Sequence, residues 1–179
     1  MHTSGVETPT EYSSADVESF GQLLEEARAR LPLVRIGDTD DDAADLDAWP
    51  ASAVWARKTW RAHRALQSFA EAKANGWRGD FMLWCKNSGA VSGAVTVPSG
   101  WVAMVESDSV ENNAAYRAAR EFPVPVEAHE DGRVFMCAHV KIVPGGRPAP
   151  RLHFFDSVDV DGFVHVGYIG EHLPNDQTN

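Results

Sequence analysis

Apolar residues recur at helical spacing in two segments near the start of the chain. In the first segment, residues 15–31, they share one helical face, and Ser14 is placed to cap its start. In the second segment, residues 50–75, Pro50 suits the first turn of a helix and Gly76 suits the end. The pattern predicts two helices, with apolar faces formed by Val17, Phe20, Leu24, Ala27 and Leu31 and by Trp55, Ala62, Leu66 and Phe69.

The middle of the chain mixes apolar runs with turn-forming residues. The run DFMLWCK at 80–86 predicts a buried strand, and residues 101–106 predict another. Gly and Ser are frequent in residues 88–100, which we expect to form a loop or a short hairpin. Residues 108–122 begin with the spacing of a capping box and predict a helix.

The last third of the chain has the alternating pattern of half-buried strands. Strands are predicted over residues 134–143, 151–156 and 163–169. The sequence PGG at 144–146 and the polar segment DSVDVDG provide the two turns. We therefore expect three consecutive strands that pair as an antiparallel meander.

The order of these elements predicts the fold class. Helices come first and antiparallel strands follow, which is typical of α+β proteins. We expect two N-terminal helices and one middle helix packed on a mainly antiparallel sheet that ends in a three-stranded meander. The predicted organisation is a disordered tail at residues 1–13, an acidic helix and linker at 14–50, and a single α+β domain at 51–179.

Charge separates the first fifty residues from the rest. The formal net charge is −10, yet residues 1–50 hold 3 basic and 12 acidic residues, whereas residues 51–179 hold 13 and 14. The acidic run at 37–48 predicts a solvated linker and not a calcium loop, because Ala43 and Trp49 stand where Gly and Glu are needed. The acidic region is a candidate surface for a protein partner, and the nearly neutral remainder is compatible with RNA or another phosphate-bearing ligand.

Composition also limits where the chain is expected to act. No apolar run reaches the length of a membrane span, so no membrane partner is expected. The first residues lack the basic start and apolar stretch of a secretory signal. Cys85 and Cys137 are too few for a disulfide framework, which predicts reduced thiols in the cytoplasm. Arginine outnumbers lysine, which is typical of GC-rich bacterial genomes.

Alternation along the predicted meander gathers titratable side chains on one sheet face. His139 and Lys141 share one face of the first strand, whose other face is apolar. A turn at 144–146 would align Arg151 and His153 of the second strand with them, and His165 could join from the third. The sequence therefore predicts a face that carries His, Lys and Arg side chains.

This face favours cleavage of RNA or another phosphodiester without a metal or cofactor. His139 and His153 would act as general base and general acid, because imidazoles titrate near neutral pH. Lys141 and Arg151 would hold the phosphate and stabilise its developing charge, with His165 as a further binding residue. We therefore hypothesise a ribonuclease-like enzyme.

Two alternatives stay open for the same face. One is a solvated sheet face without chemistry, since the outer side of an antiparallel sheet is normally polar. The other is a zinc or iron site built from His139, His153, His165 and either Asp156 or His172. The sequence contains no HxH or HExxH spacing in support of a metal.

A second binding surface is predicted on the basic helix within residues 51–79. Trp60 lies among Arg57, Arg61 and Arg64, and an aromatic ring among arginines can stack on a nucleic-acid base. Tyr168, in the segment GYIGEHLP, could form the wall of a pocket. These features equally suit a non-catalytic protein- or nucleic-acid-binding adaptor module, which is the alternative to the enzyme hypothesis.

Overall fold

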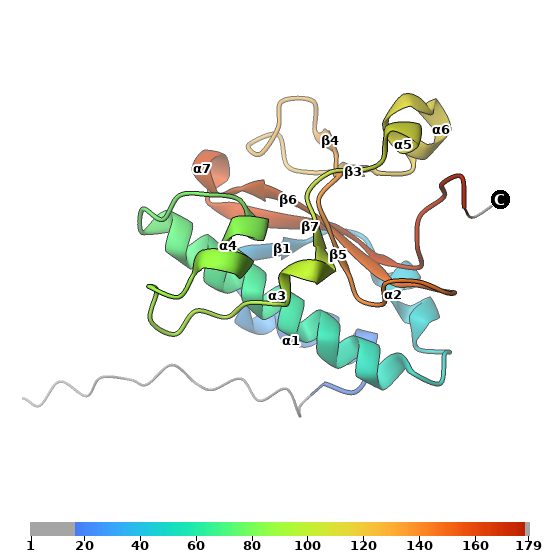
Figure 1. The fold of residues 1–179 in the computed structure, drawn as a ribbon, viewed down its shortest axis with the longest axis horizontal. Coiled ribbons are helices and arrows are strands. Elements are labelled where there is room, and N and C mark those ends of the chain that lie inside the picture. The colour runs from blue at the N-terminus through green and yellow to red at the C-terminus, as the bar shows by residue number, and fades with distance from the viewer. Residues whose placement is uncertain (1–16, 178–179) are drawn as a thin grey trace, which may run out of the picture.

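The structure is a computed structural model that describes residues 17–177. It has three layers, with helices on one face of a five-stranded sheet and residues 104–137 on the other (Figure 1). The predicted α+β class is confirmed. The predicted disordered tail and the Ser14 cap lie outside the described residues.

The central sheet contains the predicted meander and two further strands. Its spatial order is β1 (Val34–Ile36), β7 (Phe163–Gly170), β6 (Arg151–Ser157), β5 (His139–Lys141) and β2 (Val102–Ala103). β1 runs parallel to β7, whereas the other neighbours are antiparallel. The predicted register between β5 and β6 is confirmed, because His139 lies opposite His153 and Lys141 opposite Arg151. β1 was not predicted from the sequence, because a strand of three residues is too short to show an alternating pattern.

The two predicted N-terminal helices form the layer below the sheet in Figure 1. They are α1 (Phe20–Arg30) and α3 (Ser52–Ala74), and they pack against each other. α1 begins later than predicted, because the Ser19 side chain accepts the Gln22 N–H and caps the helix. The core of this layer buries the periodic positions of both helices against β6 and β7.

The acidic run forms a helix, so the prediction of a solvated linker is wrong. This helix is α2 (Asp40–Leu46), and it buries Ala43 and Leu46. Three aspartates occupy its first turn, where the helix dipole favours negative charge. Residues from α1, β1 and α2 belong to the same core as residues of α3, β6 and β7. The acidic N-terminal region is therefore part of the packed structure from Val17 onward.

The predicted strand at 80–86 is also wrong, because these residues form α4 (Phe81–Asn87). The Asp80 carboxylate accepts the Leu83 N–H at 2.8 Å and caps the helix. Phe81 and Trp84 are three positions apart and are both buried. A short apolar run fits a buried strand or a helix equally well, so periodicity alone could not separate them. Residues 88–98, which follow, form turns and no strand.

The layer above the sheet is built from short elements that the sequence suggested as longer ones. The predicted helix at 108–122 is interrupted at Asn113, whose side chain caps the second of two helices. The predicted strand at 134–143 is divided between the central sheet and a separate two-stranded sheet. The elements of this layer are α5 (Asp108–Asn112), α6 (Ala114–Ala118), β3 (Glu121–Pro123) and β4 (Arg133–Phe135). Two further short elements, the 3-10 helix η2 (Ser99–Trp101) and α7 (Val158–Asp161), instead contact α4 and α3.

This upper layer covers the sheet face that carries the histidines. A second, smaller core of Val124, Ala128 and Met136 packs there. The exposed fraction of His139 is 8%, that of His153 is 2% and that of His165 is 5%. The solvated face considered from the sequence is thus a buried interface between two layers. Within the described residues, no helix has the length and apolar character needed to cross a membrane.

Candidate functional site

His139 and His153 lie side by side on the neighbouring strands β5 and β6. Their ring centroids are 4.8 Å apart, and the planes are inclined by 27°. The His139 Nδ1 atom lies 2.9 Å from the Cys137 carbonyl oxygen, and the His153 Nδ1 atom lies 2.8 Å from that of Met136. Both carbonyls belong to the link between β4 and β5. Each histidine therefore donates a hydrogen bond to a main-chain carbonyl at the point where the predicted strand 134–143 divides between the two sheets.

Burial sets the protonation of this pair. It is the largest cause of the lowered pKa of His153, to which the charges of His139 and Arg120 add. Burial also lowers the pKa of His139, against a raising contribution from its hydrogen bond to Cys137. Both rings are neutral at pH 7. Because Nδ1 donates to a carbonyl, the lone pair of each ring is on Nε2.

Glu106 joins the two histidines from the segment after β2. Its Oε1 atom accepts a hydrogen bond of 2.7 Å from Arg120 Nε and lies 3.7 Å from His139 Nδ1. Arg120 is buried, and its NH1 group also donates to the carbonyls of Tyr116 and Pro174. Sequence reasoning missed Glu106, because a single acidic residue after a short strand has no distinguishing pattern.

Arg151 is engaged by the main chain, which does not favour its predicted role as a phosphate ligand. It is buried, and its guanidinium group donates to four carbonyls within residues 143–150. It therefore holds the turn between β5 and β6. Burial lowers its pKa, partly offset by the charge of Glu106. Lys141 lies opposite Arg151 and is half-buried.

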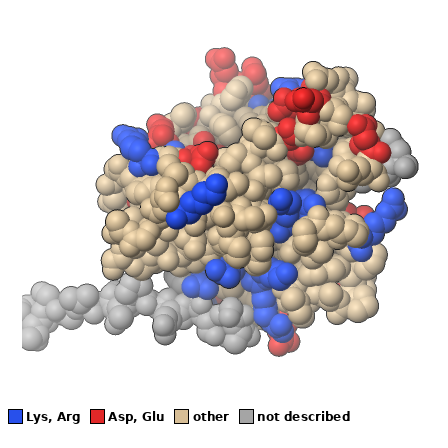
Figure 2. Space-filling view, viewed as in Figure 1, with Lys and Arg blue, Asp and Glu red and all other residues tan. Residues whose placement is uncertain are grey.

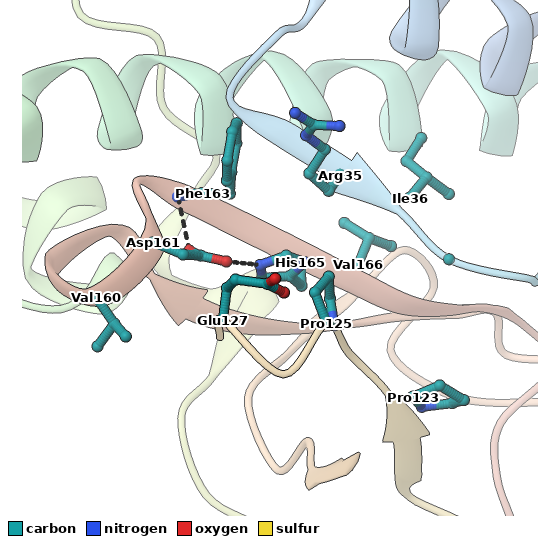
Figure 3. Close-up of a pocket in the computed structure, with 11 residues that line it drawn as sticks. Arg35, Ile36, Pro123, Pro125, Glu127, Val160, Asp161, Phe163, His165 and Val166 are labelled. Atoms are coloured by element: carbon teal, nitrogen blue, oxygen red, sulfur yellow. Dashed lines mark hydrogen bonds and ion pairs between the residues drawn. The ribbon is translucent and has the colours of Figure 1, made fainter. Parts of the chain in front are cut away.

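A cavity of about 600 Å³ lies at the β1 edge of the sheet (Figure 3). Its walls come from β1, from α7 and β7, and from residues 123–127 of the upper layer. Most of its lining is apolar. The lining residues are Arg35, Ile36, Gly37, Pro123, Pro125, Glu127, Val160, Asp161, Phe163, His165 and Val166.

A hydrogen bond between His165 and Asp161 forms part of this cavity. His165 Nε2 lies 2.7 Å from Asp161 Oδ2, and Asp161 Oδ1 accepts the Phe163 N–H. Burial would raise the pKa of Asp161, but the hydrogen bonds from His165 and from the Phe163 main chain lower it below its usual value. The carboxylate is therefore ionised at neutral pH and orients the imidazole.

Two oppositely charged side chains complete the cavity. The Arg35 guanidinium carbon lies 4.2 Å from the centre of the Phe163 ring, which orients this exposed side chain along β1. Glu127 extends beside His165 from the loop after β3 (Figure 3).

His165 was predicted as a binding residue next to His139 and His153, but it lines this separate cavity. The other polar lining residues, Arg35, Glu127 and Asp161, were not predicted from the sequence. Of these three residues, only Asp161 has a sequence signal, because it lies in the Asp161–Gly162 turn, four residues before His165.

A second cavity, of about 650 Å³, lies beside the turn that Arg151 holds. It is bordered by residues 144–149 and by Trp49, Glu171 and His172. Neither cavity is lined by His139 or His153.

Tyr168, a predicted binding residue, is packed into the interface above the sheet. Its ring stacks on Phe122 with centroids 5.7 Å apart, and its hydroxyl donates to the Glu171 carbonyl. Burial and the nearby charges of Asp42 and Glu171 raise its pKa. It lines neither cavity.

The basic helix surface predicted to bind a base is largely used within the fold. Trp60 lies in the core with 2% of its surface exposed, so its ring cannot stack on a base. Arg61 donates to the Thr96 carbonyl at 3.0 Å and lies over the Trp101 ring. Arg57 and Arg64 are half-buried. On the face shown in Figure 2, Asp and Glu gather toward the top, and Lys and Arg are spread among neutral residues.

Comparison with protein-family models, with curated proteins and with solved structures finds no match to this chain. Function is therefore argued from the geometry of the two sites, the His139–His153–Glu106 cluster and the cavity around His165.

Proposed function

We propose that the chain binds a small zwitterionic molecule with an apolar body in the cavity around His165. The observation that carries this proposal is the buried His165–Asp161 hydrogen bond in an apolar cavity edged by Arg35 and Glu127. Ligand sites are commonly concave, mainly apolar, and supplied with a few polar groups that orient the ligand. The volume of about 600 Å³ lies within the usual range for such sites.

Each polar group has a defined role in this proposal. Arg35 pairs with a carboxylate, for which its planar guanidinium group is well suited. Glu127 pairs with an ammonium group, and His165, oriented by Asp161, contributes a hydrogen bond. The apolar body of the ligand lies against Ile36 and the other apolar lining residues. Positive and negative groups in one cavity favour a zwitterion over a simple anion.

Calorimetric titration with three related probes tests the assignment. We expect L-phenylalanine to bind more tightly than 3-phenylpropionate, which lacks the ammonium group, or phenethylamine, which lacks the carboxylate. Arg35→Gln should remove the preference for the carboxylate, and Glu127→Gln the preference for the ammonium group. Each loss should be roughly 10- to 100-fold in affinity, because a hydrogen bond to a charged group is worth about 1.5–3 kcal/mol.

Matched controls for these variants lie outside the cavity. Lys86→Gln removes an exposed cation and Glu130→Gln an exposed anion close in sequence to Glu127. Neither should change the affinity for L-phenylalanine. Absence of binding for all three probes, or equal affinities in the Arg35 and Glu127 variants and the wild type, would contradict the proposal.

The phosphodiesterase hypothesis stays a prediction. The cross-strand pairing of His139 with His153 supports it, whereas their burial and the main-chain contacts of Arg151 do not favour it. Loss of RNA cleavage at pH 6–8 in folded His139→Gln and His153→Gln would favour it over ligand binding alone. The adaptor hypothesis, the cytoplasmic location and the bacterial origin are likewise predictions.

A further inference from the structure

The cluster above β5 and β6 combines three side chains with the chemistry of metal ligands. Glu106, His139 and His153 each offer a ligand atom, and these atoms lie within 4.8 Å of one another. Glu106 lies in the segment after β2, His139 lies in β5, and His153 lies in β6. This cluster is separate from the cavity around His165, so the inference does not depend on the function proposed above.

The main-chain contacts of the two histidines suit metal binding. Their hydrogen bonds to the carbonyls of Cys137 and Met136 are the kind that orient metal-binding histidines. With the Nδ1 proton held by a carbonyl, the Nε2 lone pair is available for coordination.

Arg120 positions the carboxylate. Its Nε group binds one oxygen of Glu106, and its other contacts to the carbonyls of Tyr116 and Pro174 prevent it from moving away. The second oxygen of Glu106 can then serve as a ligand. Arg120 also balances the charge of Glu106, so affinity must depend mainly on the two imidazoles. This balance favours metals with strong affinity for nitrogen over Mg²⁺ or Ca²⁺.

We propose that Glu106, His139 and His153 bind one divalent transition-metal ion, with Zn²⁺ as the preferred ion. Two imidazoles and one carboxylate are an established ligand set for zinc, and three protein ligands leave a fourth position for water or another molecule. Tetrahedral coordination at about 2.0–2.2 Å requires the ligand atoms to approach to about 3.4 Å. The ligand atoms now lie within 4.8 Å of one another, so metal binding requires side-chain rotations that shorten these separations.

Metal binding by the full chain tests the proposal directly. The protein is treated with a chelator, desalted, incubated with ZnCl₂ or CoCl₂, and desalted again before the metal content is measured. We expect about one ion per chain, and a visible Co²⁺ spectrum with the intensity of four-coordinate cobalt. His139→Gln, His153→Gln and Glu106→Gln should each weaken Zn²⁺ binding by roughly 10- to 100-fold.

His129→Gln is the matched control, because His129 lies in the loop of the upper layer, away from the cluster. It should retain the metal with unchanged affinity. If a cluster variant does not fold, X-ray absorption at the zinc edge of the loaded wild type gives an independent result. We expect scattering from two imidazole rings.

Three outcomes would overturn the proposal. The first is a wild-type chain that retains no Zn²⁺ or Co²⁺. The second is equal retention by folded cluster variants and the wild type, and the third is an absorption spectrum without imidazole. Each outcome would mean that the two histidines serve only as hydrogen-bond donors to the carbonyls of Met136 and Cys137.

Discussion

The two faces of the central sheet are stabilised in different ways. The lower face packs against α1, α3 and α4, and its core is a continuous set of apolar residues. The upper face carries His139, His153 and His165 beneath a layer whose own core is small. Buried polar groups must find hydrogen-bond partners, so the upper face depends on individual contacts to carbonyls and carboxylates. Both candidate sites lie on this upper face.

A lower-face substitution should have the largest effect on stability. Phe69 is fully buried, and its ring contacts Phe81, Trp77 and Trp84. Phe69→Ala should lower the free energy of unfolding by about 4 kcal/mol, because it removes apolar contacts and leaves a cavity. Urea unfolding measures this loss. A loss below about 1 kcal/mol would show that the helical layer is not the main source of stability.

Close packing between the sheet and the upper layer gives a second, smaller effect. A Cβ atom at Gly167 would lie 2.6 Å from Met136 Sδ and 2.7 Å from Phe122 Cβ. Gly167→Ala should therefore displace the upper layer and lower the free energy of unfolding by about 2 kcal/mol. Hydrogen exchange should increase within residues 104–137 and stay unchanged in α3.

Gly145 provides the control for this substitution. A Cβ atom there meets nothing within 4 Å, so Gly145→Ala should leave stability nearly unchanged. Equal losses for the two alanine variants would mean that the contact of Gly167 with the upper layer is unimportant.

Buried histidines on both faces should make stability depend on pH. Burial lowers the pKa of His63, in α3, from 6.5 to about 4, against a raising contribution from its hydrogen bond to Thr59. Between these values the unfolded chain binds a proton that the folded chain does not. Stability is therefore complete above about pH 6.5 and falls by roughly 1 kcal/mol per pH unit as the pH decreases toward 4.

His63→Gln should reduce this slope, as measured by urea unfolding at pH 7, 6 and 5. His129→Gln, which changes a partly exposed residue, should keep the wild-type slope. The slope that remains in His63→Gln reports His139, His153 and His172, since the pKa of each is also lowered by burial. If no slope remains, these three histidines do not resist protonation in the folded state.

Local sequence pattern was sufficient where an element is long or a turn is short. α3 was predicted over nearly its full length, because 23 residues give several periods of the helical pattern. The pairing of His139 with His153 was predicted because a tight turn and the strand period together determine register. α2 and α4 were missed, since seven residues hold too few periods to exclude a linker or a strand.

The sequence by itself determined the α+β class, the main helices, the meander and the presence of histidines on one of its faces. Only the tertiary structure decided what covers that face, because strand alternation says nothing about which distant segment packs above it. Contacts between residues far apart in the sequence place Glu106 and Arg120 beside His139 and His153. Such contacts also place Arg35 and Glu127 in the cavity around His165. Burial under these segments also lowered the pKa values of His139 and His153 and engaged Arg151 with main-chain carbonyls. These are effects of solvent exclusion, which depends on the whole fold and not on neighbouring residues.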